Sequence, residues 1–322
     1  MWNTLGILRK TFVFGCEVQR GRKIMDIKKC SKDYLIEIEI RKYTPKSLKT
    51  YRLKIAMFAN FCEEELGITD MDDVTMGSVK QFTQALMRKG RKGTYINSCL
   101  KVIKSFIQYC YEEDFGGFNT KRTSFKWVKQ EKPVIKAFDK RQVKQLLDTC
   151  RGSDFLSLRD DAIIKMFLET GIRCMELYTL KPEDIKDGFI LVHGKGNKQR
   201  YVPISPVLKK ALFRYEKVKE NYFAYKNTEP YYFLSNRGRM LTNSGIEHML
   251  RRRGEGIEGV RVSAHTFRHT FAQQTLKNGL DLYSLSRLLG HESVAITQVY
   301  LHSLEDADIV KMSKNNSVLL NM

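Results

Sequence analysis

Apolar residues recur every three or four positions through residues 31–115, which is the spacing of one helical face. The clearest predicted helix begins after Thr44, a hydroxyl residue suited to an N-cap, and runs to Gly67. Further helices are predicted from about Thr75 to Gly90, from about Thr94 to Gly116 and, shorter, in "DYLIEIEIRKY". About four helices of this kind predict a compact all-helical domain over residues 31–115, preceded by an N-terminal extension at residues 1–30.

Residues 116–137 are basic and turn-rich and lack a clean period, so they are interpreted as a linker. A second domain is predicted over residues 138–322. Its helical runs are expected at 139–150, 158–170, 174–180, 206–219, 242–252, 264–277, 281–289, 293–301 and near 304–314. Within them, "GFILVHGKGNKQRYVPI" places two short apolar strands around a glycine-rich turn, which predicts a β-hairpin. The predicted fold is therefore mainly α with a small β-sheet.

The amino-acid composition indicates the size of the core and the kind of partner that the protein binds. The chain has 322 residues with 42% hydrophobic content, enough for a core in each of two domains. Lys and Arg outnumber Asp and Glu by 56 to 36. A neutral metabolite would not require this excess, whereas a polyphosphate rewards it through counterion release. Nucleic acid is the predicted partner.

Seven cysteines, an odd number without a CxxC pair, argue against a disulfide framework and a zinc ribbon. They fit a reducing compartment, so the protein is predicted to be cytoplasmic. With DNA as its partner, it is expected to be associated with the nucleoid. The stretch "TFVFGC", which ends at Cys16, has too short an apolar core for a lipoprotein signal. No run approaches the roughly 18 apolar residues of a membrane span.

Histidines gather near the end of the chain, where four of the six lie between residues 265 and 302. In "SAHTFRHTFA", His265, Arg268 and His269 have the spacing i, i+3 and i+4, so they start near one helical face. This face offers a cation beside a proton carrier, although a core histidine and a capping arginine would give the same pattern. A zinc protease helix would need Glu where Thr266 stands, so no metal site is predicted.

Two further stretches carry single basic residues at positions where a side chain could reach a substrate. In "ETGIRCMEL", Arg173 follows a glycine that ends a helix, and in the hairpin Lys195 lies at the tip. Each is weak alone, because Arg173 could form a surface ion pair with Glu176 and the Gly-Lys-Gly stretch could be only a turn. Their order and spacing together carry the signal.

In combination these stretches resemble the tyrosine recombinases, the integrase family that includes lambda-type and Xer-type enzymes. "TGIRCMEL", "GKGNKQR", "HTFRH" and "LGHESVAITQVYLH" are similar to the boxes of that family. The resemblance implies the catalytic residues Arg173, Lys195, His265, Arg268, His291 and Tyr300, with Glu176 as a supporting acid. Ile172, Phe267 and Ile296 depart from the usual residues but leave this polar set intact.

The resemblance also implies the fold and the activity. It implies a helical core-binding (SAM-like) domain and a mixed α+β catalytic domain. The implied enzyme is a site-specific recombinase that cleaves and rejoins double-stranded DNA through a 3′-phosphotyrosine intermediate. It would act as a homotetramer on paired sites, with no cofactor and with an accessory DNA-bending or directionality factor.

The residue types suit this chemistry. Two arginines can present planar N–H forks to the oxygens of a phosphate in the transition state. A phenol with a pKa near 10 needs a proton acceptor, a role open to His265, and the leaving 5′ oxygen needs an acid, the family role of Lys195. His291 would donate a hydrogen bond to a phosphate oxygen. A phenolic phosphodiester conserves the bond energy, so the strand is resealed without ATP.

Other functions fit parts of the pattern. Integration of a mobile element is preferred to Xer-like resolution of dimers, because about 30 residues precede the helical domain. A non-catalytic DNA-binding protein would not require Tyr300, and a type IB topoisomerase would share the chemistry without paired sites. The two domains are expected to clamp duplex DNA, with Lys92, Lys101 and Lys104 as backbone contacts, although such lysines often belong to a solvated face.

Overall fold

The helices begin and end where local capping chemistry favours it. α2 (Pro45–Leu66) starts after Thr44, whose side-chain oxygen accepts a hydrogen bond from the amide of Ser47. It ends at Gly67, which adopts a left-handed conformation with φ of 67°. The start and the end predicted for this helix are thus set by hydrogen bonds of its own termini.

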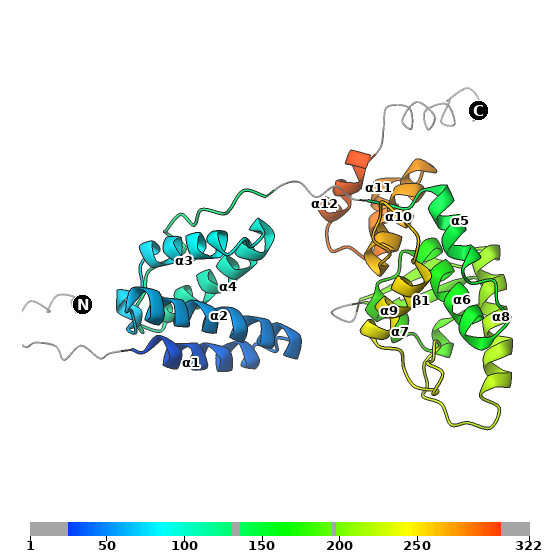
Figure 1. The fold of residues 1–322 in the computed structure, drawn as a ribbon, viewed down its shortest axis with the longest axis horizontal. Helices are drawn as coiled ribbons and strands as arrows, with labels where there is room; N and C mark the ends of the chain where they lie inside the picture. Colours follow the sequence, from blue (N-terminus) through cyan, green and yellow to red (C-terminus); the bar gives the residue numbers. More distant parts are fainter. Residues whose placement is uncertain (1–24, 131–135, 195–197, 304–322) are drawn as a thin grey trace, which may run out of the picture. The chain divides into compact units, whose positions relative to one another are not determined.

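The computed structural model describes residues 25–130, 136–194 and 198–303. The chain divides into two units, Met1–Lys132 and Pro133–Met322 (Figure 1). The predicted helix at 304–314 and the predicted hairpin tip at Lys195 lie outside the described residues.

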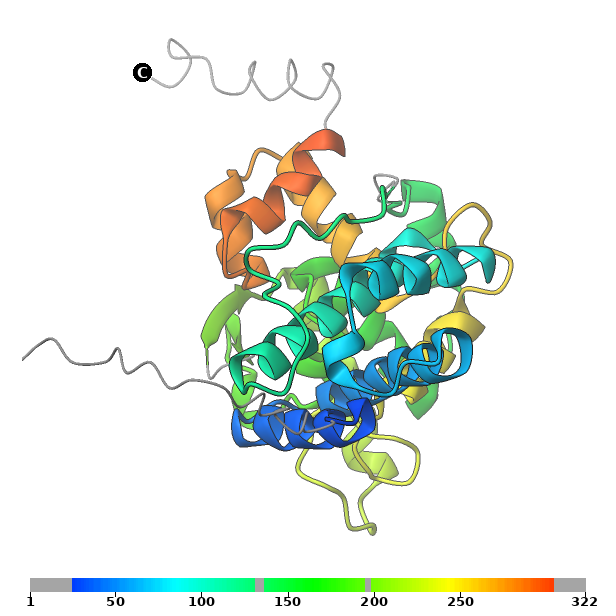
Figure 2. The ribbon, with the colours of Figure 1, turned by 90° about the vertical axis from the view of Figure 1, so that its left-hand side faces the viewer.

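The N-terminal unit is helical. It contains α1 (Ile27–Ile40), α2, the 3-10 turn η1 (Met71–Asp73), α3 (Met76–Arg88) and α4 (Gly93–Glu112) (Figure 2). Phenylalanines form its centre, with Phe58 and Phe82 edge to face at 5.3 Å between ring centroids and Phe106 fully buried. Tyr34 donates a hydrogen bond to Ser105 at 2.7 Å, which joins α1 to α4. The unit therefore has an apolar core of its own.

Part of the predicted linker packs on this unit. The side chain of Asn97 donates to the carbonyl of Val128 and accepts from its amide, both at 2.9 Å. Phe125 is buried beside α4, and the ammonium of Lys104 lies 5.4 Å from its ring centroid. The chain after α4 is thus held against the helices at least as far as residue 128.

The C-terminal unit, Pro133–Met322, is built around α6. Its helices are α5 (Lys140–Asp148), α6 (Phe155–Thr170), α7 (Cys174–Tyr178), α8 (Pro206–Tyr222), α9 (Asn243–Arg253), α10 (Ala264–Lys277), α11 (Leu282–Leu289) and α12 (Val294–Thr297), with 3-10 turns η2 (Pro182–Asp184) and η3 (Gln298–Ser303). α6 packs against α8 and α10 (Figure 1) and is buried on most sides. Its central position explains why charged residues on it must find partners in the interior.

The described strands form one antiparallel hairpin, β1 (Phe189–His193) with β2 (Gln199–Pro203), in which Leu191 pairs with Tyr201. The prediction of a mainly helical chain with a small sheet is confirmed. None of the helices in the described ranges is long and apolar enough to span a bilayer.

Candidate active site

A tight turn after α6 positions the first arginine. α6 ends at Gly171, whose φ is 57° and where a Cβ would come within 2.5 Å of Phe271. Arg173 is then the residue before α7, and its backbone amide donates to Oε2 of Glu176 at 2.8 Å. Its guanidinium donates from Nη1 to Oε1 of the same carboxylate at 2.9 Å. The Arg-x-x-Glu spacing therefore caps the helix and orients the arginine together.

Arg268 reaches the same place from α10. It is buried, and it donates from Nη1 to the carbonyl of Gly171 and from Nη2 to that of Leu289, both at 2.6 Å. Burial, and after it the charges of Arg173 and Arg200, lower its pKa to about 9. The guanidinium is thus still charged at neutral pH. It lies in a cluster of positive charges whose mutual repulsion a bound anion would reduce.

His291 lies directly after the turn that ends α11. Gly290 takes φ of 63° there, and Nδ1 of His291 is 2.8 Å from the hydroxyl of Thr297. Burial, followed by the charges of the neighbouring arginines, lowers the pKa of His291 to about 4. The imidazole is therefore neutral at neutral pH.

Tyr300 lies in η3, after α12, and its side chain is only 3% exposed. Its hydroxyl is 3.0 Å from Nδ1 of His269, and the two rings are 5.6 Å apart between centroids. Burial raises the pKa of Tyr300, although the charges of Arg268 and Arg173 act in the opposite direction. The phenol in this state is protonated.

The two histidines of α10 have different surroundings. His265 is exposed at the start of the helix, whereas His269, one turn later, is half-buried against Tyr300. Burial, and then the charges of His265 and Arg268, lower the pKa of His269. The neutral ring can accept a proton from the phenol, the role that the sequence analysis expected of His265. The i, i+4 spacing placed both histidines near one face but could not show which one reaches Tyr300.

The structure thus brings together Arg173, Glu176, Arg268, His291 and Tyr300, all within the C-terminal unit. Lys195 lies outside the described residues. Sequence reasoning missed Arg200, whose guanidinium contacts Glu176. Its only signal was its place in the quoted stretch "GKGNKQR".

The three lysines expected to contact DNA differ in exposure. Lys92 precedes α4 and Lys101 lies on it, and both are exposed. Lys104 is half-buried through its contact with Phe125. The first two side chains are therefore the more accessible to a phosphate backbone.

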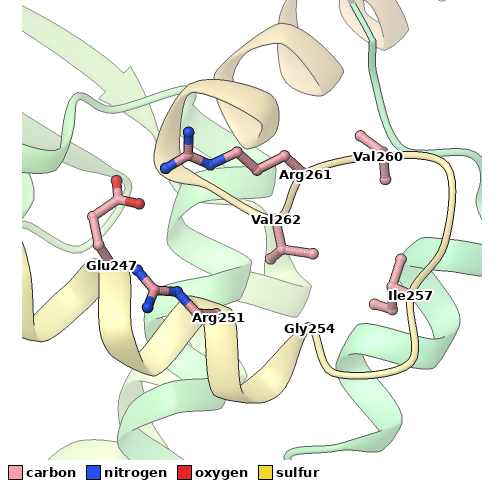
Figure 3. Close-up of a pocket in the computed structure, with 7 residues that line it drawn as sticks. All are labelled: Glu247, Arg251, Gly254, Ile257, Val260, Arg261 and Val262. Atoms are coloured by element: carbon pink, nitrogen blue, oxygen red, sulfur yellow. The ribbon is translucent and has the colours of Figure 1, made fainter.

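A separate hollow of about 130 Å³ lies between the end of α9 and the loop that follows it (Figure 3). It is lined by Glu247, Arg251, Gly254, Ile257, Val260, Arg261 and Val262. None of the residues predicted for the active site is among them. Within the described ranges, no group of three or more His, Cys, Asp or Glu side chains is arranged to hold a metal ion.

Comparison with known proteins places this arrangement in a family. Residues 136–306 match the Phage integrase family, and residues 32–114 match the phage integrase N-terminal SAM-like domain. Tyrosine recombinase XerC of Bacillus licheniformis is 33% identical over 284 residues, which cover 85% of this chain and 90% of that protein. Tyrosine recombinase XerC of Oceanobacillus iheyensis is 32% identical, over 82% of this chain and 87% of its own. The chain belongs to the phage integrase family and is a tyrosine site-specific recombinase.

Solved structures share its fold. XerH site-specific recombinase bound to a palindromic difH substrate aligns with a TM-score of 0.70 at 19% identity, over 91% of this chain and 83% of that one. A lambda integrase dimer bound to a COC′ core site aligns with a TM-score of 0.67 at 18% identity, over 86% and 95%. The SAM-like and catalytic folds expected from the sequence are confirmed.

Proposed function

We propose that Tyr300 attacks a phosphorus of double-stranded DNA. The phenol oxygen bonds to the phosphorus, the bond to the 5′ oxygen breaks, and a 3′-phosphotyrosine and a free 5′-hydroxyl result. A 5′-hydroxyl then reverses the step on the same or an exchanged strand. The observation that carries this proposal is the convergence of Arg173 and Arg268 on the carbonyls of Gly290 and Leu289, directly before His291, with Tyr300 a few residues later in η3.

The arginines supply the charge for this reaction. Arg173 and Arg268 would donate to the non-bridging oxygens, on which negative charge increases in the transition state. His291, neutral in the free protein, would donate one N–H to a phosphate oxygen. An entering phosphate would stabilise the charged forms of this cluster, because it adds negative charge where burial and like charges now lower the pKa values of Arg268 and His291.

Two protons move during cleavage. The phenol proton would pass to a histidine, and His269 lies within hydrogen-bonding distance of the phenol in the free protein. The 5′ oxygen would receive its proton from Lys195, a role implied by the resemblance. Because the phosphorus of a duplex cannot enter the protein interior, the buried Tyr300 would move outward with η3 when DNA binds.

The partner proposed for the chain is duplex DNA, contacted by the helical domain at 31–115 and by the catalytic domain at 138–322. The net charge of +20 and the DNA complexes of XerH and lambda integrase support this. A homotetramer on paired sites, an accessory directionality factor and a cytoplasmic, nucleoid-associated location complete the proposal.

Two biological roles are open to such an enzyme. Integration of a mobile element is our first proposal, from the residues that precede the helical domain. The XerC relatives favour the second, resolution of chromosome or plasmid dimers. Recombination assays on a plasmid dimer and on two separate plasmids, all carrying the candidate site, distinguish them, because a dimer resolvase separates the dimer into monomers while an integrase joins the two circles.

The chemistry is tested with a nicked duplex that carries the candidate site. After denaturation we expect a covalent protein–DNA adduct that Tyr300→Phe abolishes. Tyr283→Phe, at an exposed tyrosine of α11, is the matched control and should retain the adduct. No adduct with the unaltered protein would favour a non-catalytic DNA-binding protein, and adducts on any sequence would favour a topoisomerase.

A further inference from the structure

Arg200, on β2, is fully engaged inside the catalytic unit. Its side chain is 9% exposed, and it donates two parallel hydrogen bonds to Glu176, from Nη1 to Oε1 at 2.9 Å and from Nη2 to Oε2 at 2.7 Å. Its Nε donates to the carbonyl of Leu288 at 2.7 Å. All three guanidinium nitrogens are therefore used within the protein, in the planar geometry that lysine cannot reproduce.

Glu176 passes this restraint on to Arg173. Its side chain is 1% exposed, and each of its oxygens accepts from both arginines: Oε1 from two guanidinium groups, and Oε2 from Arg200 and the amide of Arg173. Burial raises the pKa of Glu176, but the hydrogen bonds and charge of Arg200, with those of Arg173, outweigh it and lower the pKa to about 2. The carboxylate therefore stays charged and keeps a single orientation.

The end of α11 is held by arginines in the same way. Three successive carbonyls accept from three different arginines: Leu288 from Arg200 Nε at 2.7 Å, Leu289 from Arg268 Nη2 at 2.6 Å and Gly290 from Arg173 Nη2 at 3.0 Å. The last carbonyls of a helix lack partners within the helix and carry the negative end of its dipole, so they attract cations. Arg200 thus fixes both groups that orient Arg173, the carboxylate and the turn.

We propose that Arg200 is a positioning residue for phosphate binding, which holds Glu176 and the 288–290 turn so that Arg173 keeps the orientation needed for the transition state. Arg200 itself does not contact DNA in this arrangement, because all three of its guanidinium nitrogens donate to Glu176 and Leu288. The hydrogen bonds of Arg173 and Arg268 described above involve only their two terminal nitrogens. The inference rests on the proposed function of Arg173. The hydrogen bond from Arg200 to Leu288 also connects the β-hairpin to the turn that precedes His291.

The chain offers a closely matched control for Arg200. Arg159 is also 9% exposed, donates from Nε and Nη2 to the buried carboxylate of Asp160, and donates from Nη1 to the carbonyl of Leu234. This cluster shares no residue with that of Glu176. The variants Arg200→Lys and Arg159→Lys therefore each remove three guanidinium hydrogen bonds at equal burial and keep the charge, with the difference that Arg159 donates to one carboxylate oxygen and Arg200 to both.

The first measurement is the single-turnover rate of adduct formation at saturating nicked DNA. For Arg200→Lys we expect a rate roughly 10- to 100-fold lower, since small displacements of a group in the active site have effects of this size. The dissociation constant for DNA should be unchanged. Arg159→Lys should react like the unaltered protein at a temperature at which thermal melting shows all three proteins folded.

The pH dependence separates positioning from general loss of structure. Without the fork of Arg200, the pKa of the buried Glu176 rises, so on acidification the carboxyl takes up a proton and releases Nη1 of Arg173. The rate of Arg200→Lys relative to the unaltered protein should therefore fall as the pH is lowered. The ratio for Arg159→Lys should stay constant.

Three outcomes would overturn the inference: an unchanged rate for Arg200→Lys, an equal loss in both variants, or a ratio that does not change with pH. If the unaltered protein forms no adduct, the proposed function fails, and NMR of the arginine guanidinium groups still decides the positioning role. The Arg173 signals, assigned by their loss in Arg173→Lys, should broaden in Arg200→Lys and stay sharp in Arg159→Lys. Unchanged Arg173 signals in Arg200→Lys would refute it.

Discussion

The two units differ in what they bury. Among the described residues of the N-terminal unit, Asp70 is the only charged residue that is buried, and the core is built of aliphatic, aromatic, methionine and cysteine side chains. The catalytic unit buries several charged side chains: Arg159, Asp160, Asp161, Glu176, Asp184 and Arg268. A buried charge is costly unless it is paired and hydrogen-bonded. The unit that we propose performs the chemistry is the one that contains such charges.

Two carboxylates within the catalytic unit sharpen this comparison. Asp160 on α6 is fully buried and pairs with Arg159, Arg252 and Arg253. Glu176 pairs with Arg200, whose side chain is 9% exposed, and with Arg173, whose side chain is 39% exposed. The first cluster joins α6 to α9, whereas the second ends in a guanidinium that solvent can reach. The same ion pairing thus stabilises the fold in one place and presents a charge in the other.

The largest expected effect is on stability, at Asp160. Asp160→Asn removes the shared carboxylate charge and leaves Arg159 and Arg253 without their counter-ion, which we expect to cost about 3–5 kcal/mol. Urea unfolding measures this loss. Asp187→Asn, at an exposed residue that pairs with Lys209, is the control and should leave the midpoint unchanged. Equal midpoints for the two variants would contradict the structural role of the Asp160 cluster.

Arg268→Lys should act mainly on the reaction. A lysine cannot donate to Gly171 and Leu289 and also present a fork to a phosphate, so adduct formation should slow by about 10²- to 10³-fold. Single-turnover cleavage of the nicked duplex measures it. Arg253→Lys, in the Asp160 cluster, should cleave at the original rate once folded. A slower rate for Arg253→Lys than for Arg268→Lys would reverse the roles given to the two clusters.

The decrease in the free energy of unfolding at acidic pH should depend on Glu176. Its pKa of about 2 in the folded state lies below the ordinary 4.5. The stability that it contributes is present above pH 4.5 and is lost as the pH falls toward 2, by about 3 kcal/mol. The free energy of unfolding of Glu176→Gln, followed by urea titration across this range, should lack that loss. If the free energies of unfolding of Glu176→Gln and of the unaltered protein fall in parallel with pH, the contribution assigned to Glu176 is wrong.

A smaller effect is expected at the surface of the N-terminal unit. Lys101→Ala should weaken DNA binding a few-fold and lower the slope of log affinity against log salt by about 1, as for loss of one phosphate contact. Lys104→Ala should change the slope less, because that ammonium lies over the ring of Phe125. Fluorescence anisotropy at several salt concentrations compares the variants. A larger change in slope for Lys104→Ala would reverse the order that we infer from exposure.

Removal of divalent metal should have no effect on cleavage. Arg173 and Arg268 provide the positive charge that a magnesium ion provides in many nucleases. We therefore expect the same adduct yield with EDTA as with magnesium. A loss of adduct in EDTA, restored by added metal, would show that the arginine cluster is not sufficient.

The sequence by itself determined the elements and the residue types of the site. Thr44 and Gly67 bound α2 as predicted, and the hairpin lies where two short apolar stretches around a glycine-rich turn indicated it. These signals are local, because caps and periodic faces involve residues only a few positions apart. The boxes around Arg173 and Tyr300 were visible for the same reason, as short runs with fixed spacing.

Only the tertiary structure decided how these residues meet. Arg200 reaches Leu288 across 88 positions of the chain, Arg173 reaches Gly290 across 117, and His269 rather than His265 reaches Tyr300. No periodicity encodes such pairs, since each depends on how α7, α10, α11 and the hairpin pack around α6. The residue types needed for the chemistry can be read from short local motifs. The orientation of the charged side chains depends on helix ends that the packed core brings together.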